Sequence, residues 1–339
     1  MSGTVRTVRG DIPAAALGTT LVHEHIRMDC SPLLAAHGYS PSEGLGEFDA
    51  AIAAECRWNP GAHPDNYRFT EDEPVLDDLL DFAALGGGAV VDATPLDLGR
   101  DPGALERMST DSGLHVVMGT GYYLEATHRS HLPPGDEERA AFEAIVADAA
   151  RSGPRPGMIG EIGTSDPPTA SELAVVRGAA RAALETGLPL SIHLHPWSDT
   201  AERVMAVVAG TGLAPERVLL NHMTTALARP GQVERALATG AHISFDLCGF
   251  DHSLLGAGRW PASDDEVMAE TVRLLHGRAA DRVMISQDIG VRTRLRRYGG
   301  WGYGHLLRHL VPVLRSHGAT DDDLDRLLVR TPARWLSLG

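Results

Sequence analysis

Short apolar runs alternate with longer amphipathic segments along most of the chain. In the short runs β-branched and other apolar residues stand side by side, which is typical of strands buried on both faces. In the longer segments apolar residues recur every three to four positions, which indicates helices packed on one side. The predicted strands are 19–25, 89–94, 115–119, 157–163, 188–193, 217–222, 242–246 and 282–288. The predicted helices are 48–57, 73–85, 102–112, 136–151, 169–186, 199–210, 231–239, 263–276, 303–316 and 321–328.

Eight strands that alternate with helices predict one parallel sheet closed into a (β/α)8 TIM barrel. An open doubly wound sheet is the alternative, but no Gly-x-Gly-x-x-Gly follows the first predicted strand. The length of 339 residues and the hydrophobic content of 43% suit a single domain over residues 1–339, and no change of composition marks a linker. Segment 29–70 is polar and dotted with Gly and Pro apart from the helix at 48–57, and we predict a lid-like loop insertion there.

The overall charge and composition exclude several classes of function. The formal net charge of −15 argues against binding to nucleic acid or to an anionic membrane surface. No apolar run is long enough to cross a bilayer and residues 1–18 lack a signal-peptide core, so we expect a cytoplasmic protein. The three cysteines, Cys30, Cys56 and Cys248, form no Cys-x-x-Cys pair, which fits a reducing compartment. All 30 Lys or Arg residues are arginine, which excludes Schiff-base catalysis, Gly-Lys-Ser/Thr phosphate loops and a metal bridge made of modified lysine.

The first predicted strand ends in a His-x-His pair. Side chains two apart on a strand share a face, so His23 and His25 point the same way and Glu24 points away. Two neighbouring imidazoles make half of a site for a zinc-type ion. Taken alone, such a pair is more simply explained as two polar residues at the end of an ordinary strand. The decision therefore rests on whether further ligands follow.

Four more predicted strands end in a residue that can bind a metal, namely Glu161, His193, His222 and Asp288. Each one singly could be a hydrogen-bonded core residue or part of a turn. Strand ends of a barrel meet at one rim, so six such residues at the same level favour a metal site. Four His and two carboxylates exceed the needs of one tetrahedral zinc, and we predict two divalent ions, with zinc as the expected metal, bridged by Glu161. Asp288 would bind one ion and act as the general base.

These positions resemble the phosphotriesterase-like branch of the metal-dependent amidohydrolases, and the resemblance runs nearly end to end. The matching segments are Thr20–His25, Gly99–Asp101, Gly119–Tyr123, Gly160–Ser165, Asn221–His222, Ser286–Asp288 and Tyr298–Tyr303. The resemblance implies a (β/α)8 barrel with a binuclear, usually zinc, centre. Carried over by position, it implies His23, His25 and Asp288 on one metal, His193 and His222 on the other, and Glu161 between them.

One departure from the best-known members concerns the bridge, which is a carboxylated lysine in those proteins. With glutamate at that position, the long first loop, Asp246–Gly249 and Pro332–Trp335, the chain is most similar to the glutamate-bridged subgroup of phosphotriesterase-related proteins. That subgroup includes enzymes that hydrolyse the amide bond of N-acetylated small acids. The resemblance therefore implies amide hydrolysis in preference to organophosphate hydrolysis.

Candidate substrate contacts lie in the loops beyond the strands. A phenol of Tyr122 or Tyr123 could polarise a substrate carbonyl, although aromatic packing explains them equally well. His195 repeats the His-x-His spacing and would be permitted as a ligand, but the family pattern favours His193. We place His195 and Trp197 in a loop, as substrate contacts or as simple loop packing. Arg292 and Tyr298 follow the last strand, where a guanidinium could bind an anionic group, although most arginines of an acidic protein are solvated.

These features together predict a binuclear metal-dependent hydrolase in which a metal-bridging hydroxide attacks the amide carbonyl of an N-acyl small acid. A lactonase acting on a small or anionic lactone is the alternative, since the two transition states have nearly the same shape. A promiscuous phosphotriesterase and a non-catalytic metal-dependent binding protein are further alternatives. The expected partner is a small-molecule substrate, anionic if the loop arginines face it, and the sequence leaves room for a homodimer.

Overall fold

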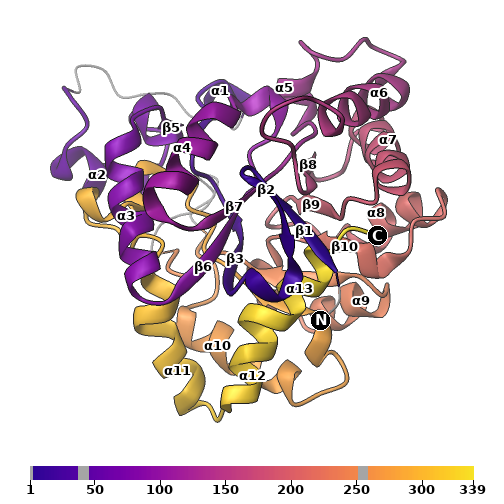
Figure 1. Ribbon diagram of the computed structural model, residues 1–339. Coiled ribbons are helices and arrows are strands. Elements are labelled where there is room, and N and C mark those ends of the chain that lie inside the picture. Colours follow the sequence, from indigo (N-terminus) through magenta and orange to yellow (C-terminus); the bar gives the residue numbers. More distant parts are fainter. Residues whose placement is uncertain (1–2, 37–45, 251–258) are drawn as a thin grey trace.

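Eight parallel strands form the centre of the molecule in the computed structural model, which describes residues 3–36, 46–250 and 259–339 (Figure 1). All eight predicted strands are present. The first ladder contains β3 (Thr19–Glu24), β6 (Gly87–Asp92) and β7 (His115–Met118). The second contains β8 (Ile159–Thr164), β9 (Leu190–Leu194), β10 (Val218–Leu220), β11 (His242–Phe245) and β12 (Val283–Ile285).

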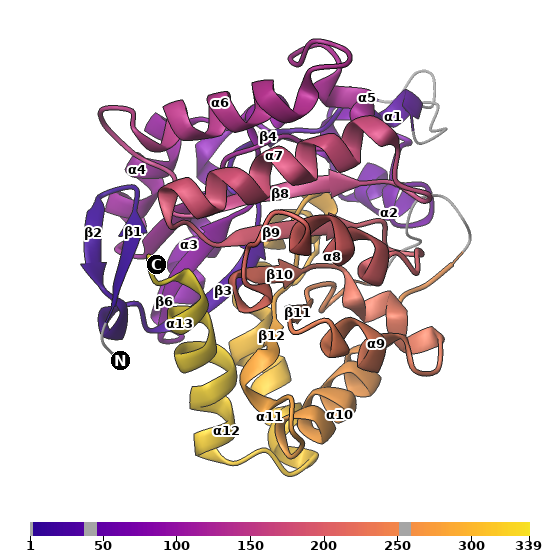
Figure 2. The same ribbon diagram turned by 90° about the vertical axis from the view of Figure 1, so that its right-hand side faces the viewer.

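Backbone hydrogen bonds link the two ladders at both of their edges. The amide of Asp288, just after β12, donates to the carbonyl oxygen of His23 on β3 over 3.1 Å. The amide of Gly157, just before β8, donates to the carbonyl oxygen of Met118 on β7 over 2.9 Å. With helices packed around the outside (Figure 2), this is the predicted α/β fold with the strand arrangement of a TIM barrel.

Alternate residues on β3, β6, β7, β10 and β12 belong to two different parts of the core. Val91 and Val117 pack in an inner cluster together with Trp335 from the end of the chain. Their neighbours Val90 and Val116 belong to the larger cluster that the surrounding helices cover. This alternation explains why the strands read as continuous apolar runs, because both faces of each strand are buried.

The ten predicted helices are all present, most with ends within two residues of the predicted ones. The α-helices are α1 (Leu33–Ala36), α2 (Ala50–Trp58), α3 (Asp72–Ala84), α4 (Pro102–Ser112), α5 (Glu125–His128), α6 (Glu137–Ala149), α7 (Ala170–Thr186), α8 (Ala201–Ala209), α9 (Gln232–Ala238), α10 (Asp264–Leu275), α11 (Val311–Ser316), α12 (Asp321–Asp325) and α13 (Thr331–Leu336). None of the helices in the described ranges combines the length and the apolarity needed to cross a bilayer.

The last helical region extends further than the sequence predicts. A π-helical turn at Arg326–Arg330 follows α12, and α13 then continues to Leu336, whereas the prediction ended at residue 328. Pro332 lies inside this continuous helical region, just after the π-helical turn, and its missing N–H leaves one backbone carbonyl without the usual i+4 donor. A similar π-helical turn, Leu306–Leu310, precedes α11.

A short hairpin at the start of the chain was not predicted. Strands β1 (Thr4–Thr7) and β2 (Gly10–Pro13) pair antiparallel, and the buried side chain of Val5 joins the inner cluster with Trp335. The hairpin therefore covers the end of the barrel at which the strands begin. The amide of Leu338 donates to the carbonyl oxygen of Thr4 over 2.9 Å, so both ends of the described chain lie on this face.

Segment 29–70 has more structure of its own than the predicted loop with a single helix. Its ends are held together by β4 (Met28–Asp29) and β5 (Arg68–Phe69), which pair antiparallel. Helix α1 and the predicted helix, observed as α2, lie between them, and Asp49 caps α2 by accepting from two of its backbone amides. Part of this segment, residues 37–45, lies outside the described residues.

Candidate metal centre

The end of β3 turns His23 and His25 toward the barrel axis and Glu24 away from it, as the strand alternation predicts. Both carboxylate oxygens of Glu24 accept hydrogen bonds from the region after β12, including the hydroxyl of Ser286 at 2.8 Å and the amide of Ile289 at 2.9 Å. Burial raises the pKa of Glu24 to about 7 in spite of these bonds. Glu24 therefore fixes the strand that carries the two histidines to the strand end that carries Asp288.

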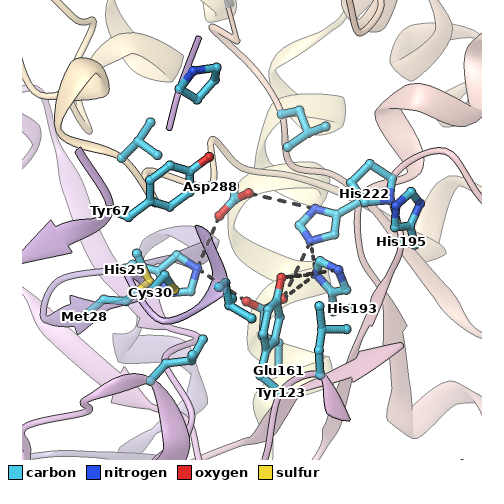
Figure 3. Close-up of a pocket in the computed structure, with 18 of the residues that line it drawn as sticks. His25, Met28, Cys30, Tyr67, Tyr123, Glu161, His193, His195, His222 and Asp288 are labelled. Atoms are coloured by element: carbon cyan, nitrogen blue, oxygen red, sulfur yellow. Dashed lines mark hydrogen bonds and ion pairs between the residues drawn. The ribbon is translucent and has the colours of Figure 1, made fainter. Parts of the chain in front are cut away.

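Glu161 on β8 lies among the four predicted His ligands, of which His25, His193 and His222 are labelled in Figure 3. Its Oε2 is 3.1 Å from His193 Nδ1 and 3.6 Å from Nε2 of both His222 and His23. Its Oε1 is 3.5 Å from His25 Nε2. The carboxylate thus faces both pairs of imidazoles at once, as a bridging ligand must.

Asp288 closes the other side of the cluster. Its Oδ1 lies 3.6 Å from His23 Nε2 and 3.3 Å from His25 Nε2, and its Oδ2 lies 4.0 Å from His222 Nδ1. The side chain is 18% exposed, against 4% for that of Glu161. Asp288 is therefore the carboxylate of the centre that is most open to the cavity.

The donor set fits divalent metal ions. Both ring nitrogens of His23 are buried and have no hydrogen-bond partner, although a buried polar atom normally has one. Potential ligand atoms lie within 4.8 Å of one another in two groups that share His23, one with Glu161 and His222 and one with His25 and Asp288. By contrast, both ring nitrogens of the buried His128, outside the centre, have hydrogen-bond partners. The six predicted ligands thus come together, and His23 among them has both ring nitrogens without a hydrogen-bond partner.

The protonation states of Glu161, Asp288 and His193 suit the same role. Burial alone would raise the pKa of Glu161, but the charge of His23 and hydrogen bonds with His193 and His222 hold it well below its usual value. Burial would also raise the pKa of Asp288, but the hydrogen bond with His25 and the charges of His23 and His222 hold it well below its usual value. Burial lowers the pKa of His193 to about 4. Ionised carboxylates and a neutral imidazole are the forms that bind a divalent cation. In spite of burial, the neighbouring carboxylates raise the pKa of His25 to about 9 and that of His222 well above its usual value, so these two imidazoles would release a proton when a cation binds.

Two residues behind the ligands were not among the predicted site residues. Asp246, directly after β11, accepts from the backbone amide of His222 with both oxygens at 3.0 Å, and its Oδ1 lies 3.1 Å from His222 Nδ1. The hydroxyl of Thr94 lies 2.9 Å from His25 Nδ1. Such partners orient metal-binding imidazoles. The position of Asp246 at a seventh strand end was a signal in the sequence that could have identified it.

A cavity of about 850 Å³, open mouth included, leads from the centre toward solvent. Of the six predicted substrate contacts, Tyr123 and His195 line it, and Tyr122, Trp197, Arg292 and Tyr298 are not among its lining residues. The hydroxyl of Tyr123 lies 3.1 Å from His193 Nδ1, so its phenol reaches the centre itself.

The four other predicted contacts pack against protein. The ring of Tyr122 belongs to the main core cluster, and Trp197 lies under the guanidinium of Arg259 at 5.7 Å. Arg292 Nε donates to the carbonyl oxygen of Arg68 over 2.8 Å, and the ring of Tyr298 lies 5.1 Å from that of Phe48. Arg292 and Tyr298 therefore hold segment 29–70 against the barrel.

The model of the phosphotriesterase family matches residues 3–336 of the chain. The chain belongs to the phosphotriesterase family. Members of this family are binuclear metal enzymes, and the cluster described above contains candidate ligands for such a centre. The chain is thus a metal-dependent hydrolase, as the sequence predicts.

Three proteins are similar to this chain over nearly its whole length. Human N-acetyltaurine hydrolase is 30% identical over 351 residues, which cover 99% of each chain. A resiniferatoxin-binding protein from Rhodobacter sphaeroides is 35% identical, with a TM-score of 0.90 over 99% of this chain and 95% of that one. A weak promiscuous lactonase that served as a template for engineering organophosphate hydrolysis is 28% identical, with a TM-score of 0.75 over 99% of this chain and all of that one.

Proposed function

We propose that this protein hydrolyses the amide bond of an N-acyl small acid. The observation that carries the proposal is the convergence of six metal-binding side chains on one cavity, in a chain that aligns end to end with an N-acetyltaurine hydrolase. Amide hydrolysis needs an activated water molecule and a polarised carbonyl, and a binuclear centre supplies both.

We assign the ligands as the sequence predicts. His23, His25 and Asp288 would hold one ion, His193 and His222 would hold the other, and Glu161 would bridge them, with zinc as the expected metal. The support for the bridge is the distance of 3.1 to 3.6 Å from the Glu161 oxygens to a nitrogen of each histidine. Thr94 and Asp246 would hold the imidazoles in place from behind.

The protein side chains then have defined tasks. The bound ions would supply an acidified water molecule and withdraw electrons from the amide carbonyl. Asp288 Oδ2, at the open side of the cluster, would accept the proton of the attacking water and pass it to the leaving amine. The hydroxyl of Tyr123 would donate a hydrogen bond to the carbonyl oxygen as negative charge develops there.

Lactone hydrolysis is the second candidate, because the cavity is lined largely by apolar side chains and a lactonase is among the similar structures. Phosphotriester hydrolysis would be a side activity. One similar protein is described as binding resiniferatoxin, so the experiment should also distinguish catalysis from non-catalytic binding.

One sample decides among these functions. Protein purified without chelator is analysed for metal by plasma mass spectrometry and is then offered N-acyl amides, lactones and one aryl phosphotriester. About two equivalents of metal, with the highest kcat/KM on an N-acyl acid, are expected. If only lactones were hydrolysed, the proposed substrate would be a lactone and not an amide. Metal binding without turnover of any substrate would favour a binding protein. If the protein bound no metal even after reconstitution, the proposed metal centre would be wrong.

Segment 29–70 is proposed to act as the cover of the substrate site, since Met28, Cys30, Leu33, Pro60 and Tyr67 from and beside it line the cavity. A cytoplasmic location and a homodimer stay predictions from the sequence. The three cysteines are free and buried, which is compatible with a reducing compartment.

A further inference from the structure

One wall of the cavity is a buried apolar cluster. Its five members are at most 8% exposed and all line the cavity: Met28, Cys30, Leu33, Leu98 and Leu124. They come from three places in the chain, namely the region after β3, the loop after β6 and the loop after β7. The rings of Tyr67 and Tyr123 pack against them, so the apolar surface reaches the metal ligands without a break.

No cation faces this wall. All 30 arginines lie within the described residues, the chain has no lysine, and none of the arginines is among the residues that line the cavity. Apart from the predicted metal ligands, His195 is the one basic side chain among the described lining residues. An anionic group placed against the wall would lose its hydration without gaining a partner.

His195 lies on the opposite side of the cavity from Met28 and Cys30 (Figure 3), and two guanidinium groups that do not line the cavity lie beside its loop. The guanidinium of Arg229 donates to the carbonyl oxygen of Trp197, and that of Arg259 lies over the Trp197 ring. The Nδ1 of His195 accepts from the backbone amide of Trp197 over 3.2 Å, which leaves Nε2 to carry the hydrogen and donate it. The two sides of the cavity therefore differ in chemistry, since one is an apolar cluster and the other carries the imidazole of His195 as a hydrogen-bonding group.

We propose that the preferred substrate is an N-acyl acid whose acyl group is an apolar chain longer than acetyl, lying against Met28, Leu33 and Leu98, with its acid group toward His195. This inference rests on the proposed amide hydrolysis and names its substrate class. An acetyl group has one methyl to offer this wall and would leave most of it in contact with water. Each additional buried methylene is worth about fourfold in affinity for the bound chain.

The chain-length dependence of kcat/KM tests the proposal on the metal-loaded enzyme. With N-acyl glycines from acetyl to octanoyl, kcat/KM should rise about fourfold for each of the first methylenes and then level off. Binding of the free carboxylates from acetate to octanoate, measured by calorimetry, should rise in parallel and does not depend on turnover. If neither kcat/KM nor carboxylate affinity rises with chain length, the apolar wall does not bind the acyl chain and the proposal is wrong. Amide hydrolysis itself would be unaffected by that result. If carboxylate affinity rises with chain length but no amide is hydrolysed, the apolar wall binds the chain and the proposed amide hydrolysis is wrong.

A matched pair of variants locates the chain within the cavity. Leu33→Ala shortens the apolar wall, whereas Leu247→Ala makes the same change elsewhere in the cavity lining. Leu33→Ala should lower the octanoate-to-acetate affinity ratio about tenfold, the equivalent of one to two lost methylene contacts, and Leu247→Ala should leave the ratio as it is. Equal effects of the two variants would refute the placement. Cys30→Phe, which fills the wall, should shift the best chain length downward and serves if Leu33→Ala fails to fold.

Discussion

Replacing Asp246 with Asn should weaken the binding of the ion assigned to His193 and His222. The buried carboxylate holds His222 through both oxygens at 3.0 Å from its backbone amide and at 3.1 Å from its Nδ1. Asn keeps one oxygen for the backbone amide but turns an N–H toward the imidazole and removes the charge that favours a proton on Nδ1. Loss of such an orienting partner costs about 10- to 100-fold in metal affinity, or roughly 1.4 to 2.8 kcal/mol.

Competition with a graded series of chelators measures this change, with metal per chain read by plasma mass spectrometry. One of the two ions should leave the Asp246→Asn variant at a lower chelator strength than it leaves the native protein. Thr94→Val is the matched control, because it removes the contact to His25 Nδ1 at 2.9 Å and should loosen the other ion. Two ions bound with native affinity in Asp246→Asn, in a protein that melts normally, would refute the orienting role.

Three further outcomes are expected. Glu161→Ala should abolish paired-metal binding while circular dichroism still shows a folded barrel, and two retained ions would remove Glu161 as the bridge. Asp288→Asn should keep the fold and lose most of kcat, by about 100-fold or more if it is the general base, and undiminished turnover would exclude that role. Burial lowers the pKa of His242 to about 4, and the charges of Arg334 and Arg282 act in the same direction. Below pH 6.5 the unfolded chain then binds a proton that the folded protein does not, so stability falls as the pH drops toward 4. Between pH 7 and pH 4.5, the free energy of unfolding in urea should fall by roughly 2 to 3 kcal/mol less in His242→Gln than in the native protein. An equal fall in both proteins would refute this role of His242.

The centre could be predicted because it depends on regular structure. His23, His193 and His222 belong to different strands, but parallel strands end at a common rim, so their position along each strand determines that they meet. Asp246 follows the same rule at the end of β11. It was not predicted because the prediction covered metal ligands and not the residues that orient them. The fold was predictable for the same reason, since alternate residues such as Val90 and Val91 face two apolar environments.

The loops could not be predicted in this way, because their side chains follow tertiary contacts that leave no periodic signal. Arg292 is part of an arginine-rich segment that suggested an anion site, yet its guanidinium holds Arg68 and the inserted segment. Tyr122 and Tyr123 are neighbours in the sequence, but one packs in the core and the other reaches the centre. The hairpin β1–β2 carries charged side chains, so its strands lack the apolar runs that identify the barrel strands.

The backbone hydrogen bond between Leu338 and Thr4 has a practical consequence. It keeps the two ends of the described chain side by side on the face opposite the cavity. Ends this close can be joined by a short flexible linker, and the chain can be reopened at an exposed turn such as the one at Gly153, to give a circular permutant. A resin, electrode or fused carrier attached at either end would face away from the entrance, and small molecules would still reach the cavity freely.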